Sequence, residues 1–189
     1  MSDNISIEEQ LYHLLDNSDK NNDKKAKEII LQNPSLNINW QNENVSNLTC
    51  LHNACHYNRY EIISLLLTQY PNINPNLQND YGWTPLHLAC GTNNVESVKL
   101  LLNDERIDIN IKNCDGNTGL MDAADRGYIA IIEYILASMR HNITLIPNAI
   151  ERAKGNNNIE IVKLLESYQA QPATITKNLR VKLNITGEK

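Results

Sequence analysis

The residues best suited to chemistry in this sequence lie in one short segment. Cys50, His52, Cys55 and His56 fall within seven residues, and thiolates and imidazoles are ligands that zinc prefers. Their spacing is not the usual zinc pattern, in which one Cys-x-x-Cys pair is matched by a second pair. A packed thiol is the simpler interpretation of Cys55, because it directly follows the small residue Ala54. We therefore expect no metal ion and no other cofactor.

The sequence also lacks the motifs of two common groups of enzymes. The sequence has no Gly-x-Ser-x-Gly turn that would present a serine nucleophile. It has seven glycines, mostly isolated, and so it has no glycine-rich loop for a phosphate. A nucleophile with separate His and Asp partners stays open from sequence alone. We expect no catalytic residue, and a protein that is not an enzyme.

The charge and length of the chain limit its domain count and the kinds of partner that it can bind. The chain has 189 residues, enough for one domain of ordinary size, and a net charge of -5. From residue 169 onward four basic residues face one acidic residue, so the tail carries +3 and the body carries -8. An acidic body repels phosphate backbones, so we expect no nucleic-acid partner. It favours a basic protein partner, although acidity also serves solubility alone.

Membrane and export signals are not apparent in the sequence. No segment approaches the roughly 18 apolar residues that a membrane span needs. The first ten residues are polar and acidic, unlike a secretory signal. Four scattered cysteines do not form a disulfide framework, which favours a reducing compartment. We expect no membrane contact and a cytoplasmic location, with the nucleus as the alternative.

The elements that must position these residues follow from an internal repeat. Residues 49–55 read Thr-Cys-Leu-His-Asn-Ala-Cys, residues 84–90 read Thr-Pro-Leu-His-Leu-Ala-Cys, and residues 118–124 read Thr-Gly-Leu-Met-Asp-Ala-Ala. The steps between the threonines are 35 and 34 residues. Thr84 suits a helix N-cap, and Pro85 suits the first helical position. Each block precedes an apolar helical pattern, and one helix pair cannot bury its apolar face alone, so the units must stack.

This pattern resembles the ankyrin-repeat family, whose signature is Thr-Pro-Leu-His-x-Ala at a period of about 33 residues. The resemblance covers residues 5–168 and is strongest over 40–137. It implies an all-α solenoid of about five helix pairs joined by hairpin loops. The expected repeats are approximately 5–39, 40–76, 77–110, 111–143 and 144–168, followed by a C-terminal tail at 169–189. Glycines expected after the apolar helices of the second and third repeats are missing, which leaves the loop geometry open.

The resemblance also implies where a protein partner binds. In such a stack the hairpin tips and first helices form a concave surface, and partners usually bind there. The predicted partner-binding residues are Trp40, Leu48, His56, Tyr57, Asp80, Tyr81, Trp83, Asp115, Asp125 and Arg126.

Aromatic side chains predict the centre of this surface. The chain has two Trp and no Phe, and both Trp fall on predicted hairpins. Exposed aromatic residues are favoured binding hot spots. We predict an aromatic patch of Trp40, Tyr57, Tyr81 and Trp83, flanked by Asp80, Asp115 and Asp125. The alternative is that each ring packs on the next hairpin and only stabilises the stack.

Asn110 ends the segment Asp108-Ile109-Asn110. It resembles the position that an oxygen-sensing asparagine hydroxylase modifies in some ankyrin repeats. The simpler interpretation, which we favour, is a hydrogen bond of the Asn110 side chain within its hairpin.

The tail shows a different pattern. Leu179, Val181, Leu183 and Ile185 alternate with polar residues, and strict alternation is typical of a half-buried strand. Such a strand would be added to a partner's sheet or dock back along the repeat stack. The alternative is a disordered tail.

Two functions follow from the resemblance and the tail. The first is a protein-binding adaptor, scaffold or inhibitor that presents its concave surface and is a monomer in isolation. The second is a structural subunit of a larger assembly, with its tail docked on a neighbour. The chain leaves no room for a separate catalytic domain delivered by the repeats.

Overall fold

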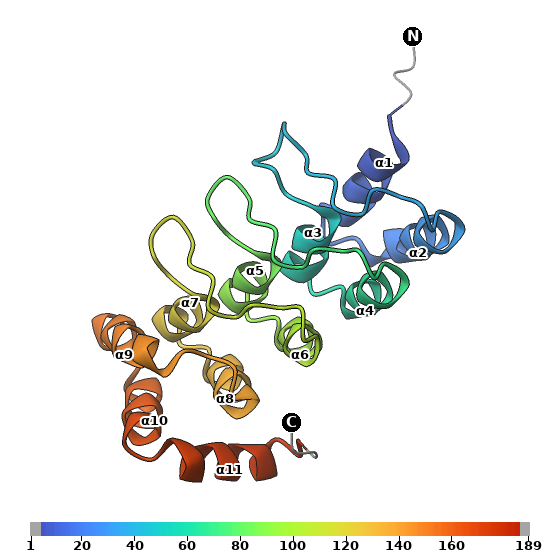
Figure 1. Cartoon of the computed structure of the whole chain (residues 1–189). Coiled ribbons are helices and arrows are strands. Elements are labelled where there is room, and N and C mark those ends of the chain that lie inside the picture. Colours follow the sequence, from blue (N-terminus) through green and yellow to red (C-terminus); the bar gives the residue numbers. More distant parts are fainter. Residues whose placement is uncertain (1–4, 186–189) are drawn as a thin grey trace.

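The structure is a computed structural model, and it describes residues 5–185 as a curved stack of helix pairs (Figure 1). The first helices of the pairs are α1 (Ile7–Leu15), α3 (Cys50–His56), α5 (Pro85–Gly91), α7 (Gly119–Arg126) and α9 (Ile146–Gly155). The second helices are α2 (Asp23–Gln32), α4 (Tyr60–Gln69), α6 (Val95–Asn103), α8 (Ile129–Ser138) and α10 (Ile159–Ala170). A last helix, α11 (Pro172–Lys182), and two 3-10 turns, η1 (Lys20–Asn22) and η2 (Ile143–Leu145), complete the described part.

The helices form two rows, and long loops extend beyond the row of first helices (Figure 1). Within the first row α1 packs on α3, α3 on α5, α5 on α7 and α7 on α9. Within the second row α2 packs on α4, α4 on α6 and α6 on α8. Between residues 5 and 185 the only β-type pairing is an isolated bridge from Asn42 to Leu48. The predicted all-α solenoid of about five helix pairs is therefore confirmed.

The repeated motif begins each first helix by a reciprocal cap. Thr84 is the N-cap of α5, and its side chain accepts a hydrogen bond from the backbone N–H of His87 at 3.4 Å. In return, the Nδ1 atom of His87 accepts one from the backbone N–H of Thr84 at 3.1 Å. Thr49 and His52 form the same capping box on α3. This arrangement satisfies backbone donors that a helix otherwise leaves unpaired at its N-terminus.

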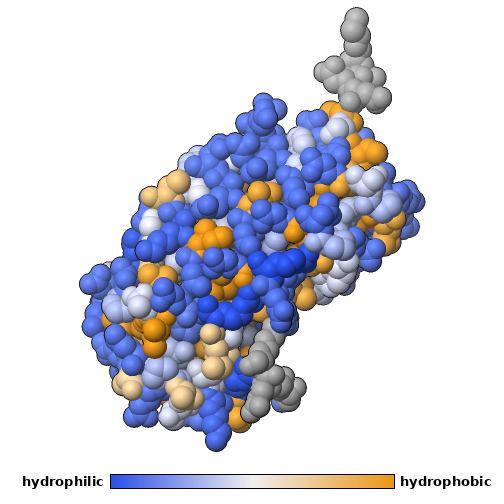
Figure 2. All heavy atoms as spheres, viewed as in Figure 1, coloured by the Kyte–Doolittle hydropathy of each residue, from blue (hydrophilic) through white to orange (hydrophobic). Residues whose placement is uncertain are grey.

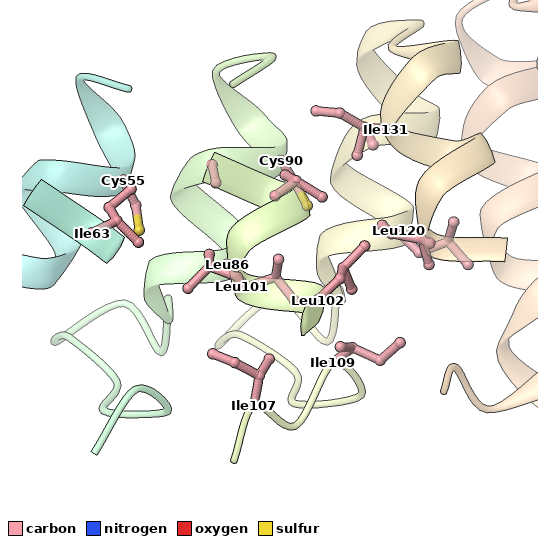
Figure 3. Close-up of a cluster of buried hydrophobic side chains, with 14 of the residues drawn as sticks. Cys55, Ile63, Leu86, Cys90, Leu101, Leu102, Ile107, Ile109, Leu120 and Ile131 are labelled. Atoms are coloured by element: carbon pink, nitrogen blue, oxygen red, sulfur yellow. The ribbon is translucent and has the colours of Figure 1, made fainter. Parts of the chain in front are cut away.

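Small residues allow the first helices to approach closely. Ala54, Ala89 and Ala123 are fully buried. Figure 3 shows Cys55 and Cys90 among the leucines and isoleucines of the core. Both thiols are fully buried, so they are packed core residues, and burial raises their pKa well above the ordinary range. The face drawn in Figure 2 is mainly hydrophilic with small separate apolar patches, so apolar side chains are concentrated between the helices.

Arginine side chains contact the ends of α4 and α6, the second helices of the second and third repeats, where the expected glycines are missing. The Nη2 atom of Arg106 donates to the carbonyl of Leu67, in the last turn of α4, at 2.9 Å. The Nη1 atom of Arg140, 34 residues further on, donates to the carbonyl of Leu102 in α6, also at 2.9 Å. In both cases the arginine lies in the loop that follows the next repeat's second helix. It donates to carbonyl groups in the last turn of a helix, which lack partners within that helix.

The strand predicted for the tail is wrong, because residues 172–182 form the helix α11. Leu179 is buried at 5% exposure, whereas Val181 is 76% exposed, so neighbouring members of the alternating set face different environments. Ile175, Leu179 and Leu183 are spaced by four residues and pack against the core. This spacing is typical of a helix, and it is present in the same residues that alternate with polar ones. The helix packs on α8 and α10, with Lys182 Nζ at 2.5 Å from Glu133 Oε1. The tail therefore docks along its own stack, and residues 186–189 lie outside the described part.

Candidate protein-binding surface

The loops and first helices enclose a hollow of about 320 Å³ on the concave side. Five of the predicted binding residues line it: Leu48, His56, Tyr57, Tyr81 and Trp83. We call this hollow, defined by these five residues, the aromatic groove. Its size is at the lower end of the range for ligand-binding clefts in proteins.

The hairpin before α5 presents two aromatic rings of the groove. The side-chain oxygen of Asn79 accepts hydrogen bonds from the backbone N–H groups of Tyr81, at 3.0 Å, and Trp83, at 2.9 Å. Gly82 between them has a φ of +72°, which side chains rarely allow. The two rings lie 5.4 Å apart between centroids, and Tyr81 is 56% and Trp83 37% exposed. The hairpin therefore holds a rigid aromatic pair toward solvent.

Successive hairpin tips are tied together through their backbones. The N–H of Asp80 donates to the carbonyl of Ser46 at 3.0 Å, and the N–H of Cys114 donates to the carbonyl of Tyr81 at 3.0 Å. The Asp80 carboxylate also accepts a hydrogen bond from Asn47 at 2.6 Å. Asp80 thus contributes to the alignment of the tips.

Trp40 is placed apart from the other aromatic residues of the predicted patch. Its half-buried ring meets Tyr12 edge-on, with centroids 5.9 Å apart, and it does not line the aromatic groove. His56 and Tyr57, at the end of α3, form a second edge-on pair with centroids 4.7 Å apart. The structure therefore brings together Tyr57, Tyr81 and Trp83, while Trp40 packs on the first repeat.

The remaining predicted residues, Asp115, Asp125 and Arg126, belong to the fourth repeat. Asp115 is exposed on the tip, and its backbone N–H donates to Asn113. Asp125 accepts a hydrogen bond from Asn156 at 2.8 Å. Arg126 lines a second hollow of about 210 Å³, which shares His56 and Trp83 with the aromatic groove.

Three lining residues that the sequence prediction missed share one place in the motif. Asn53, Leu88 and Asp122 each lie four residues after the motif threonine, at the variable position of Thr-Pro-Leu-His-x-Ala. Asn53 and Leu88 line the aromatic groove, and Leu88 and Asp122 line the second hollow. The side-chain type differs between repeats at this one position of the motif, and that variation is the sequence signal that could have identified these residues.

Asn53 has an unusual environment. It is only 4% exposed, and its side chain interacts with the hydroxyl of Tyr12, which opposes the rise that burial causes in the pKa of Tyr12. The groove thus contains a buried polar group beside Tyr12.

The two motif histidines have structural roles. His52 Nδ1 accepts the backbone N–H of Thr49, and His52 Nε2 lies 3.0 Å from the carbonyl of Trp83. Burial lowers the pKa of His52 to about 4, and it lowers the pKa of His87 as well. Between residues 5 and 185 no cluster of three His, Cys, Asp or Glu side chains is arranged to hold a metal ion.

Asn110 connects two loops. Its Nδ2 atom donates to the carbonyl of Arg140 at 3.1 Å, and its Oδ1 atom accepts the N–H of Asn142 at 2.6 Å. The hydrogen bonds of its side chain therefore reach the following loop instead of staying within its own hairpin.

The comparison with family models agrees with this architecture. A model described as ankyrin repeats, in three copies, matches residues 14–113 and again residues 51–147. Since these matches cover more than half of the sequence, the chain belongs to the ankyrin-repeat family. Members are generally protein–protein interaction modules and are typically not enzymes. A search of curated proteins found no match to this chain. No helix in the described residues is both long and apolar enough to cross a membrane.

Proposed function

We propose that this protein is an adaptor or inhibitor that holds a protein partner in the aromatic groove. The observation that carries the proposal is the pair Tyr81 and Trp83, which is fixed by its hairpin and yet exposed at 56% and 37%. Rigid aromatic residues lose little conformational freedom on binding, and each contributes roughly 1.5–3 kcal/mol when its side chain is fully buried. They are the residue types that dominate binding energy in protein interfaces.

The amide of Asn53 adds a buried polar group to the same site. A partner segment lying in the groove would offer backbone carbonyl and N–H groups to this amide. Specific recognition in such clefts commonly combines an apolar wall with a few polar groups of this kind.

The charge of the chain suggests the character of the partner. A net charge of -5 favours the approach of a basic protein and makes the rate of association fall as salt rises. All four cysteines are free thiols, which fits a reducing compartment such as the cytoplasm. We expect the isolated protein to be a monomer. A structural subunit with its tail on a neighbour is not favoured, because α11 packs on α8 and α10 of its own chain.

Affinity capture from native lysate tests this proposal. The wild-type chain is compared with a Tyr81→Ala/Trp83→Ala variant of equal helicity. Tyr60→Ala is the control, because it removes a ring of intermediate exposure, 44%, from α4 in the other row of helices. We expect one protein to be captured by the wild type and the control but lost with the double variant.

The captured protein is then purified and its affinity measured directly. Loss of two hot-spot rings should weaken binding by at least about 2 kcal/mol, which is roughly 30-fold in Kd. If the double variant captures and binds the same proteins with unchanged Kd, the rings are structural and the proposal fails.

A further inference from the structure

The second hollow extends the aromatic groove toward the C-terminal repeats. It shares His56, Trp83 and Leu88 with the groove, and α7 adds Asp122 and Arg126. A segment that lies over Trp83 therefore passes from the aromatic groove directly to the carboxylate of Asp122.

Asp122 is half-buried in the first turn of α7. Across residues 5–185 it makes no ion pair within 4.0 Å and its side chain accepts no hydrogen bond. Burial raises the pKa of Asp122 to about 6, while the charge of Arg126, one turn further along α7, acts in the opposite direction. A half-buried carboxylate without a counter-ion is unfavourable in a free protein, and a positive charge brought by a ligand would relieve it.

We propose that Asp122 accepts a lysine or arginine side chain of the protein partner, with the stem of that side chain lying against the ring of Trp83. This inference rests on the proposed function and adds the chemistry of the residue that the partner inserts. A cation beside a carboxylate and an indole gains both the ion pair and the attraction of the ring face. The acidic charge of the whole chain acts in the same direction.

Arg126 raises the opposite possibility, an acidic partner residue in the same hollow. Its side chain is long and exposed, so its guanidinium is free to turn into solvent when a cation enters. Asp122 has a short side chain in the body of α7 and cannot withdraw from the hollow. An incoming carboxylate would thus be repelled at short range, whereas an incoming cation would not. Geometry therefore favours a basic residue.

The proposal implies that affinity falls as pH is lowered. The charged groups around Asp122 are Arg126 and Asp125 on α7, Arg152 on α9, Asp115 on the preceding tip, and His56 and His87 across the hollow. Between pH 7 and 5 the Asp122 carboxylate gains a proton, and any charge gained by the exposed His56 also repels a cation. Replacing Asp122 with Asn separates the two effects, because only the contribution of the histidines would remain.

The test uses the full chain labelled with nitrogen-15 and two small probes. The first probe is N-acetyl-arginine amide, and the second is N-acetyl-citrulline amide, which has nearly the same shape without the charge. The chain has two Trp, so its two indole N–H signals are a reporter at Trp83 and a reference at Trp40, outside both hollows. We expect the arginine probe to shift the Trp83 signal saturably at pH 7, and to bind about tenfold more tightly than citrulline.

Two variants of opposite sign complete the design. Asp122→Asn should bring the arginine probe to the affinity of citrulline, and Arg126→Ala should strengthen its binding several-fold by removing a competing cation. Equal binding of the two probes to the wild type, or unchanged arginine binding in Asp122→Asn, would overturn the proposal. Tighter binding of N-acetyl-glutamate amide that is lost in Arg126→Ala would also overturn it, in favour of an anionic residue.

The outcome is separable from that of the proposed function. If the probes fail while Tyr81→Ala/Trp83→Ala still abolishes capture of the partner, the aromatic groove stands and the subsite for a basic residue falls. If the probes succeed while the double variant retains its partner, Asp122 binds cations at a surface that the captured partner does not use.

Discussion

The Nε2 atom of His52 lies 3.0 Å from the carbonyl oxygen of Trp83, so the first helix of one repeat holds the hairpin of the next. Because His52 Nδ1 accepts the backbone N–H of Thr49, the proton of the neutral ring resides on Nε2, which donates to that carbonyl. His87 makes the same contact with the carbonyl of Asn117 at 3.0 Å. One residue therefore caps its own helix and fixes a groove residue of the following repeat.

This contact predicts a pH-dependent stability. The pKa of His52 is about 4 in the folded protein against an ordinary value of 6.5, so the unfolded chain binds more protons between these values. The contribution of His52 to the free energy of unfolding should therefore fall by on the order of 3 kcal/mol as pH decreases from about 6.5 to 4, and level off below pH 4. Urea unfolding at pH 7, 5.5 and 4 measures it.

A His52→Gln variant provides the control. Glutamine preserves a side chain that reaches back to the N-cap, but it does not titrate. The variant should be less stable at pH 7 and should lose less stability on acidification, with His87 accounting for part of the remaining loss. An unchanged pH slope in the variant would exclude His52 as the responsible group.

Substituting Gly82 with alanine should destabilise the protein more than the same substitution at Gly116, although the two glycines have similar backbone conformations. A Cβ at Gly82 would lie 2.8 Å from the backbone nitrogen of Cys114, whereas a Cβ at Gly116 would meet nothing within 4 Å. Both have positive φ, at +72° and +77°. Gly116→Ala should cost about 1–2 kcal/mol from backbone strain alone. Gly82→Ala should cost at least about 1 kcal/mol more, because its clash is with backbone that cannot turn aside. Equal urea midpoints would show that the neighbouring tip moves freely.

How far the sequence predicts this molecule depends on the range of the interactions involved. The capping residues Thr84 and Pro85 act within one turn of helix, and the period of 35 and 34 residues locates the same turn elsewhere, so the helices and their stacking followed from local signals. The positions of Tyr81 and Trp83 on a hairpin followed for the same reason, because a hairpin tip is a fixed place in the repeat.

Other features depend on contacts between repeats and were missed. Trp40 was assigned to the aromatic patch, but its orientation is set by Tyr12, which lies 28 positions earlier in the chain. Asp122 was overlooked because only the stack of α5, α7 and α9 determines which helix face is concave. The tail was misread because Leu179 and Val181 fit both a strand and a helix, and only the surface of α8 decides between them.

The docking of α11 predicts unequal effects of two substitutions in that helix. Leu179→Ala removes a side chain that is 5% exposed and should cost about 2–4 kcal/mol. Val181→Ala, at a position that is 76% exposed, should change the free energy of unfolding by less than about 0.5 kcal/mol. Thermal unfolding followed by circular dichroism distinguishes them. Two equally mild variants would mean that α11 is not held on α8 in solution.

Asp122 predicts a gain in stability from the variant that weakens binding. Its pKa is raised by burial to about 6, so ionisation disfavours the folded state and stability increases as pH falls toward the ordinary value of 3.8. Asp122→Asn should therefore unfold at a higher temperature than the wild type at pH 7, and the difference should shrink below pH 6. A variant less stable than the wild type at pH 7 would show that the carboxylate supports the fold instead.

The arginine contacts at the helix ends have a direction along the chain. Arg106 reaches back to α4, Arg140 to α6, and Arg180 of α11 to the carbonyl of Ala137 in α8 at 3.4 Å. During synthesis, which proceeds from the N-terminus, each of these helices thus leaves the ribosome before the residue that completes its end. Arg180 of α11 therefore has the same role at the end of α8 that Arg106 and Arg140 have at the ends of α4 and α6. In a nascent chain the end of α8 would therefore gain this contact only after Arg180 has left the ribosome.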